Sequence, residues 1–165
     1  MLPIGFNLEH LDIGIRNLVV NINRIPEVYT CTTCEGHIWR DTLAWPTKDG
    51  WLHFDVKEGT NSELIPEINR FLEWHPNFEL QDWDGQRISK EYLHYTMLAH
   101  FESHEDGDLL YRINKKQQSA YFARAEKRLK DNLNGWADLE WVVIEYLKRH
   151  VREDYKNLPF MWKEE

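Results

Sequence analysis

The sequence lacks the features that mark several broad classes of protein. It contains no apolar run approaching the roughly 18 residues that a membrane-spanning helix requires. Its start, MLPIGFN, holds no basic segment followed by an apolar stretch, which a secretory signal would have. Two cysteines are too few for a scaffold held together by disulfides. We therefore expect a cytoplasmic protein with no membrane association.

Excess positive charge and the common catalytic motifs are also missing. The chain has 20 basic and 28 acidic residues, which give a net charge of −8. Clustered Lys and Arg supply most of the affinity for phosphate backbones, so this charge disfavours nucleic acid as a partner. The signatures G-x-x-x-x-G-K-[ST], G-x-G-x-x-G, G-x-S-x-G and H-E-x-x-H do not occur. Ordinary P-loop, Rossmann, serine-hydrolase and zincin activities are thereby excluded.

Length and composition indicate one globular domain. With 165 residues, the chain has the usual size of a single domain, 1–165, which we divide into an α/β core (1–102) and a helical C-terminal extension (103–165). Eight tryptophans make the aromatic share unusual, although large aromatic side chains mostly fill cores. Large aromatic side chains also dominate protein interfaces, so a protein partner is one candidate.

Hydrophobic periodicity predicts an α+β fold. Helices are expected over 8–22, with Asn7 as the cap, and between a cap at Ser62 and Pro76; 109–133 and 136–155 should form two more, separated by Asn134-Gly135. Strands are expected over 28–30, 38–45, 51–57, 78–83 and 92–101. The resulting architecture is a small mixed β-sheet with two helices packed on one face, followed by a C-terminal helical hairpin.

Two of these strands place titratable side chains opposite their apolar side chains. In 51–57, His53 and Asp55 alternate with apolar residues, and in 92–101 His94, Thr96 and His100 do the same. If the two strands are neighbours in register, these groups share one polar face of the sheet and form a titratable cleft. Otherwise they simply face solvent.

The segment 30–37, Thr-Cys-Thr-Thr-Cys-Glu-Gly-His, carries the most specific signal in the chain. Gly36 permits a positive φ, so that neighbouring N–H groups can converge on a polar ligand group, to which Thr33 also donates. Cys34 is a candidate nucleophile if its pKa is lowered, and His37 is a candidate acid/base. We assign Cys34 and His37 as catalytic candidates. Thr33, Gly36, His53 and Asp55 are the ligand-binding candidates.

The same region carries a family resemblance. The segment 26–30, then Thr33-Cys34-Glu35-Gly36-His37, then Trp51-Leu52, resembles a group of bacterial and phage proteins of unknown function that share a Ser-Cys-x-Gly-His loop. It is more distantly similar to the tRNA wybutosine-synthesising methyltransferase family, whose loop reads Ser-Ser-Cys-Ser-Gly-Arg. In this chain His37 stands in place of that arginine. The resemblance covers about residues 8–57 and implies an α/β arrangement rather than a particular reaction.

Metal binding is an alternative role for the loop. Cys31, Cys34 and His37 form C-x-x-C-x-x-H, and His53 would complete a four-ligand zinc set if its strand lies beside the loop. Asp55 would then orient His53. The plain alternative is two ordinary cysteines in a tight turn.

Three functional hypotheses follow. The favoured one is a site for a small or nucleotide-like ligand at the 31–37 loop. The second, from a different class, is a non-catalytic protein-interaction module, for which the tryptophans and the acidic charge argue. The third is a module stapled by zinc. An exposed aromatic patch without a hollow at the loop would favour the second over the first.

Overall fold

The structure is a computed structural model that describes residues 11–41, 46–83, 90–101 and 110–159. Its α+β class agrees with the prediction. The elements follow one another as α1 (Ile13–Ile22), β1 (Val28–Cys34), β2 (His37–Ile38), β3 (Thr47–Lys48), β4 (Gly50–Lys57), α2 (Leu64–Trp74), β5 (Phe78–Asp82), β6 (Tyr92–Ala99), η3 (Leu110–Arg112), α4 (Lys115–Tyr146), the π-helical turn η4 (Leu147–Val151) and η5 (Tyr155–Asn157).

The main sheet has the strand order β1-β4-β6-β5, and every neighbouring pair is antiparallel. The predicted mixed sheet is therefore wrong. The reason lies in the connection through α2, which joins β4 to β5. These two strands run in the same direction, but β6 lies between them and pairs with both, so no parallel pair forms. A short two-stranded sheet, β2-β3, extends the turn between β1 and β4.

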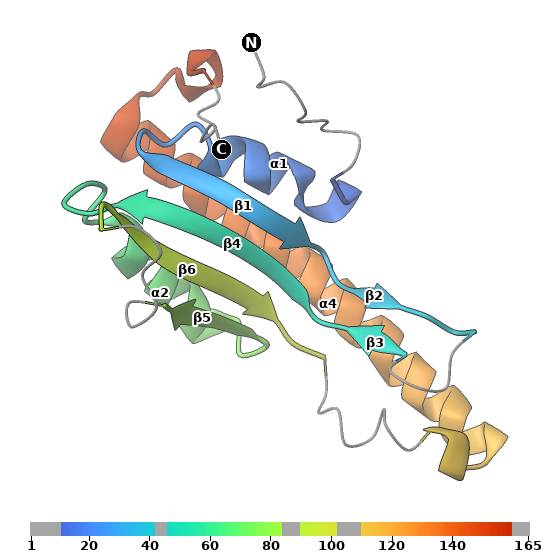
Figure 1. Cartoon of the computed structure of the whole chain (residues 1–165). Coiled ribbons are helices and arrows are strands. Elements are labelled where there is room, and N and C mark those ends of the chain that lie inside the picture. Colours follow the sequence, from blue (N-terminus) through green and yellow to red (C-terminus); the bar gives the residue numbers. More distant parts are fainter. Residues whose placement is uncertain (1–10, 42–45, 84–89, 102–109, 160–165) are drawn as a thin grey trace.

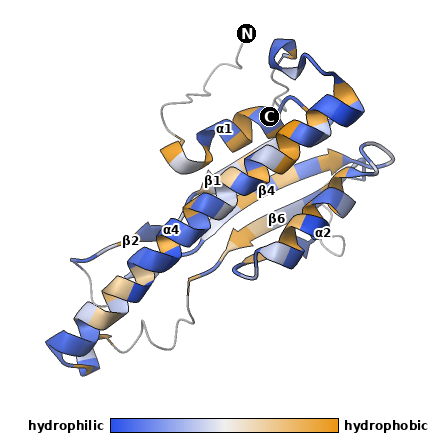
Figure 2. Ribbon diagram, turned by 180° about the vertical axis from the view of Figure 1, so that it is seen from behind, coloured by the Kyte–Doolittle hydropathy of each residue, from blue (hydrophilic) through white to orange (hydrophobic). Residues whose placement is uncertain are grey.

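The helices α1, α2 and α4 all lie on one side of the sheet, and none of the described helices covers the other side (Figures 1 and 2). Alternation along the strands produces this arrangement, because the helix-facing side of β4 carries Leu52, Phe54 and Val56. Met97 and Tyr95 lie opposite Leu52 and Phe54 on β6. These side chains belong to the main hydrophobic core, as the sequence predicts.

The C-terminal region contains one long helix instead of the predicted hairpin. Asn134-Gly135 was expected to end a helix, but α4 runs through it without a break. Gly135 serves for packing, because a Cβ there would lie 2.3 Å from Cε2 of Phe78. The next residue, Trp136, is fully buried, and its ring meets Phe78 edge-on with 4.9 Å between the centroids. The glycine thus allows α4 to lie close to β5.

Several element boundaries also differ from the prediction. α1 begins after Asp12, and Asn7 with residues 8–10 lies outside the described residues. α2 begins after Glu63 instead of Ser62, with Pro66 in its first turn, where a missing N–H is tolerated. The predicted strand 38–45 overlaps β2 (His37–Ile38) only at Ile38, and residues 42–45 lie outside the described residues. The predicted polar loop 103–108 also lies outside them.

Candidate functional site

The loop after β1 is fastened to the helical layer. The carboxylate of Asp12, at the start of α1, accepts a hydrogen bond from the N–H of Glu35 at 2.9 Å. Glu35 in turn accepts one from the N–H of Gly14 at 2.7 Å, where the helix dipole favours a negative charge. The indole N–H of Trp136 donates to the carbonyl of Glu35 at 3.2 Å. These contacts assign Glu35 a structural role that joins the loop to α1 and α4.

The environment of Cys34 does not activate its thiol. Burial raises the pKa of Cys34, the negative charge of Asp12 raises it further, and the hydrogen bond from the Gly36 N–H opposes the shift without cancelling it. Reactive cysteines need the opposite, a lowered pKa and access to solvent. The imidazole of His37 lies beside Asp12 rather than acting on the thiol, with 3.5 Å between Nε2 and Oδ2.

The other two loop candidates, Gly36 and Thr33, are positioned by the pairing of β1 with β4 and by the turn that follows β1. Gly36 has φ of +100°, as expected for the turn, and a Cβ there would lie 3.2 Å from the N of Gly50 and the O of Lys48. Its lack of a side chain therefore serves the hairpin. Thr33 pairs with Leu52 across β1 and β4. The expected hollow is not among the two pockets described next, since neither is lined by a loop residue.

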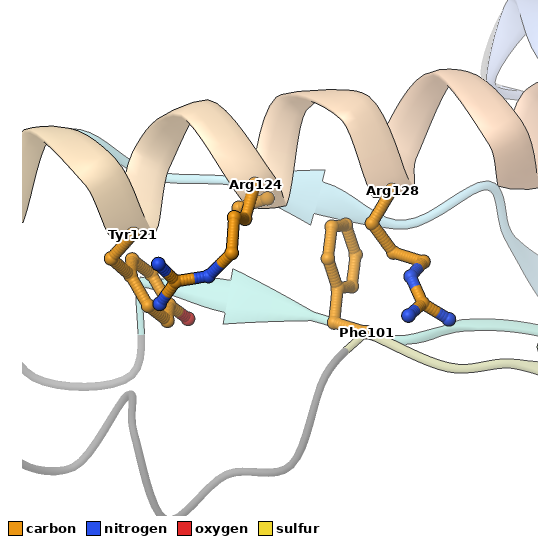
Figure 3. A pocket seen from close by; sticks show the side chains of 5 residues that line it. Phe101, Tyr121, Arg124 and Arg128 are labelled. Carbon is orange, nitrogen blue, oxygen red and sulfur yellow. The ribbon is translucent and has the colours of Figure 1, made fainter.

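The first pocket is a narrow crevice between the N-terminal half of α4 and the end of β6. Figure 3 shows the ring of Phe101 there, with Arg124 and Arg128 descending from α4 on either side of it. Its free volume of about 10 Å³ is comparable to one water molecule, so it is too small for an organic ligand. The second is a shallow depression of about 400 Å³ lined by Gln81, Asp82 and Trp83.

The polar face predicted from strand alternation is present. In the β4–β6 register His53 lies opposite Thr96, and Asp55 lies opposite His94. The carboxylate of Asp55 and Nδ1 of His94 are 2.5 Å apart. Although no described helix covers this face, Asp55 is 5% and Thr96 2% exposed. The Nε2 atom of His94 is enclosed and has no hydrogen-bond partner among the described residues.

A second chain of hydrogen bonds crosses the same face. The indole N–H of Trp83 donates to the Thr96 hydroxyl at 2.7 Å, and that hydroxyl lies 2.6 Å from Nδ1 of His53. Burial lowers the pKa of His53, although the nearby charge of Asp55 opposes the shift. A neutral imidazole fits this arrangement, because Thr96 then donates its hydroxyl proton to Nδ1 of His53 while it accepts from Trp83.

His100, expected on the same face, lies just beyond the end of β6. Its Nδ1 is 2.8 Å from Asp49, and its Nε2 is 2.8 Å from Glu79 on β5. Burial lowers the pKa of His100, but the hydrogen bonds to Asp49 and Glu79 outweigh it, so the net pKa is raised. This histidine therefore bridges two acidic side chains.

The predicted four-residue zinc set is not assembled. Cys34 and His37 come together, but their companion is Asp12, and the three ligand atoms lie within 4.8 Å of one another. Cys31 is exposed and lies outside this group, and His53 is bonded to Thr96 instead. Cys31 lies within the register irregularity of β1, between Thr30 and Thr33. The spacing of the cysteines could not reveal Asp12, which α1 brings to the loop from far upstream.

Among the described residues, the aromatic side chains with the highest exposed fractions lie on α2 and α4. Trp74 at the end of α2 is 82% exposed, and Trp141 on α4 is 64% exposed. His75 follows Trp74 in the chain, and its Nε2 lies 2.9 Å from the carboxylate of Asp138 on α4. The abundance of tryptophan is visible in the sequence, but no sequence pattern separates these two from the buried Trp136.

Comparisons with protein-family models, with curated proteins and with solved structures return no match. Among the described helices, none combines the length and the apolar character required to cross a bilayer.

Proposed function

We propose that the protein is a non-catalytic protein-interaction module whose docking surface is formed by Trp74 and Trp141. The supporting observation is the exposure of these two side chains, at 82% and 64%. An indole ring held in water is costly, and tryptophan is the residue type most enriched among those that dominate binding energy at interfaces.

We place the two rings on one surface because a contact between His75 and Asp138 links the helices that carry them. His75 follows Trp74 directly and contacts Asp138 on α4. Trp141 lies three residues beyond Asp138, so the side chains of Asp138 and Trp141 are neighbours on the surface of α4. The ring of His75 is also stacked on buried Phe71, with centroids 4.0 Å apart, which fixes the end of α2. A rigid support of this kind lowers the entropic cost of binding.

The negative charge of the chain indicates what kind of partner the surface binds. The chain has a net charge of −8, and two acidic residues, Glu73 and Asp138, are exposed beside the tryptophans. A second copy of the chain would bring another large negative charge to the same surface, which disfavours self-association. A protein segment with apolar side chains flanked by Lys or Arg complements both the rings and the charge. We take this as the chemistry of the partner.

Selection of displayed random peptides on the full-length protein tests the proposal. We expect the selected peptides to combine apolar and basic residues and to bind less tightly as salt is raised. Trp74→Ser with Trp141→Ser should weaken binding by about 30-fold or more, which corresponds to the roughly 2 kcal/mol of a hot spot. Tyr111→Ser is the matched control, since Tyr111 is 59% exposed and lies on η3. Equal binding by the double variant would contradict the proposal.

A second candidate function, a site for a small or nucleotide-like ligand, is favoured by the polar face of the sheet. The enclosed Nε2 of His94 has a hydrogen-bonding capacity that none of the residues in the described ranges uses. Trp83 joins the network to an open depression beside it. A site on the polar face of the sheet would include the ligand-binding candidates His53 and Asp55. It would not include the 31–37 loop.

Ligand-observed NMR with nucleoside monophosphates and small carboxylates tests this second candidate. Binding should be lost in His53→Ala and Asp55→Asn and retained in His150→Gln, a control in η4. If no compound binds, or if the His53 and Asp55 variants bind as the wild type does, the polar face has only a structural role.

A further inference from the structure

We propose that Asp12, Cys34 and His37 form a zinc-binding site that joins the start of α1 to the turn between β1 and β2. One thiolate sulfur, one imidazole nitrogen and one carboxylate oxygen are ligand types that Zn²⁺ uses. The three ligand atoms already lie within 4.8 Å of one another. This set differs from the one that the cysteine spacing suggests.

Each ligand is held in place by a different piece of backbone. Cys34 is the last residue of β1 and His37 is the first of β2, and Gly36 turns the chain between them with a positive φ. Asp12 precedes the first residue of α1 and is fixed by the N–H of Glu35. Glu35 is itself fixed by Gly14. Such supporting hydrogen bonds orient metal ligands and raise their affinity.

The contacts of the thiol fit a metal ligand. The sulfur of Cys34 receives a hydrogen bond from the backbone N–H of Gly36, and the thiol donates one to the carboxylate of Asp12. A Zn²⁺ ion would take the place of the thiol proton, which is released to solvent. The two charges of the ion then balance those of the thiolate and the carboxylate, so the occupied, partly buried site carries no net charge.

The solvent access of the ligands and the number of ligands are also consistent with a zinc site. The side chains of His37 and Asp12 are 38% and 30% exposed, so the ion can enter from solvent, whereas the sulfur is buried below them. Three protein ligands leave one position of a tetrahedral zinc site open for water or for an external ligand. The inference is independent of the docking surface of Trp74 and Trp141.

Titration of the metal-stripped full-length protein with Zn²⁺, followed by calorimetry and elemental analysis, tests the site. We expect one bound equivalent with release of protons. Titration with Co²⁺ should give a sulfur-to-cobalt charge-transfer band, which requires a thiolate ligand. Zn²⁺ should also raise the melting temperature, because the ion binds only the folded chain.

Variants separate this site from the competing set. Cys34→Ser, His37→Gln and Asp12→Asn should each weaken Zn²⁺ binding by about 100-fold or more, since even residues that only orient a metal ligand cost about 10- to 100-fold. Cys31→Ser and His53→Gln are the controls and should bind as the wild type does. Loss of binding in these controls, or absence of the cobalt band in the wild type, would overturn the proposal. The cobalt band is measured on unaltered protein, so the test holds even if a variant fails to fold.

Discussion

At the scale of single residues, the contact between Gly135 and Phe78 sets how close α4 lies to the sheet. A Cβ at position 135 would lie 2.3 Å from Cε2 of Phe78, and that ring is confined by Phe71 and Trp136. Alanine favours helix over glycine by about 1 kcal/mol, but overpacking of a core costs about 1–3 kcal/mol. We therefore expect Gly135→Ala to lower the free energy of unfolding.

Urea denaturation measures this effect, and the neighbouring position provides the control. Asn134 is exposed in the same turn of α4, so Asn134→Ala should gain roughly 0.5 kcal/mol from helix propensity. If Gly135→Ala also stabilised the protein, the ring of Phe78 would not restrict position 135 to glycine, and the prediction would be wrong.

His100 should make the stability of the protein depend on pH. Its pKa is raised in the folded state, so its contribution is complete below its ordinary value of 6.5 and is lost as the pH rises through the folded pKa. The hydrogen bond from His100 lowers the pKa of Glu79, so that partner contributes above 4.5 and loses its contribution as the pH falls through the lowered value. The interaction between His100 and Glu79 is therefore strongest at pH values between the lowered pKa of Glu79 and the raised pKa of His100.

Comparing urea midpoints of wild type and His100→Gln at about pH 6 and about pH 8, within the range where histidines titrate, checks this prediction. The difference between the two proteins should shrink at the higher pH. Glu79→Gln should remove part of the same difference. A difference that grows with pH would show that His100 is not held in its charged form.

At the scale of secondary-structure elements, α4 begins with a complete capping box. The side chain of Asn114 accepts a hydrogen bond from the N–H of Gln117, and the side chain of Gln117 accepts one from the N–H of Asn114. This end of the helix packs on a small separate cluster, made of Phe101, Leu110, Tyr121, Phe122 and Ala125. The cap therefore stabilises a part of α4 that lies beyond the main core.

Replacing Asn114 with Ala should cost about 1 kcal/mol, the usual value of a lost N-cap. Because the affected turn is far from the main core, hydrogen exchange should accelerate most at the start of α4 and little around Trp136. Ser119→Ala, an exposed change in the same region, is the control. Uniform acceleration along α4 would mean that the helix opens as one unit.

The elements also explain which parts of the fold were predictable. Alternation placed His53 and Asp55 on one face because the strand period of two is a local property. The predicted break at Asn134-Gly135 failed because the reason for the glycine, the ring of Phe78, comes from a distant segment. Asp12 was missed as a neighbour of Cys34 for the same reason, since only the docking of α1 brings it to the loop.

At the scale of the whole molecule, the one-sided packing of the helices separates three candidate surfaces. Trp74 and Trp141 lie on the helical side, whereas the polar network of His53 and Asp55 lies on the side of the sheet that none of the described helices covers (Figures 1 and 2). The group around Cys34 lies where β1 ends. Variants at one surface should therefore leave the others unchanged, which makes the proposed functions separable by experiment.

The main core predicts cooperative unfolding of the whole sheet with its helices. One cluster contains Leu18 of α1, Phe54 of β4, Phe71 of α2 and Trp136 of α4, so no layer can separate without exposing the others. We expect far-UV circular dichroism and tryptophan fluorescence to give coincident urea transitions, as a single domain should. The small cluster at the start of α4 is the one described part that could unfold earlier, and Phe122→Ala, which removes a ring from it, should leave the main midpoint nearly unchanged. Two separate main transitions would contradict the prediction of one domain, because they would require the sheet and α4 to be stable apart despite the packing of Trp136 on Phe78.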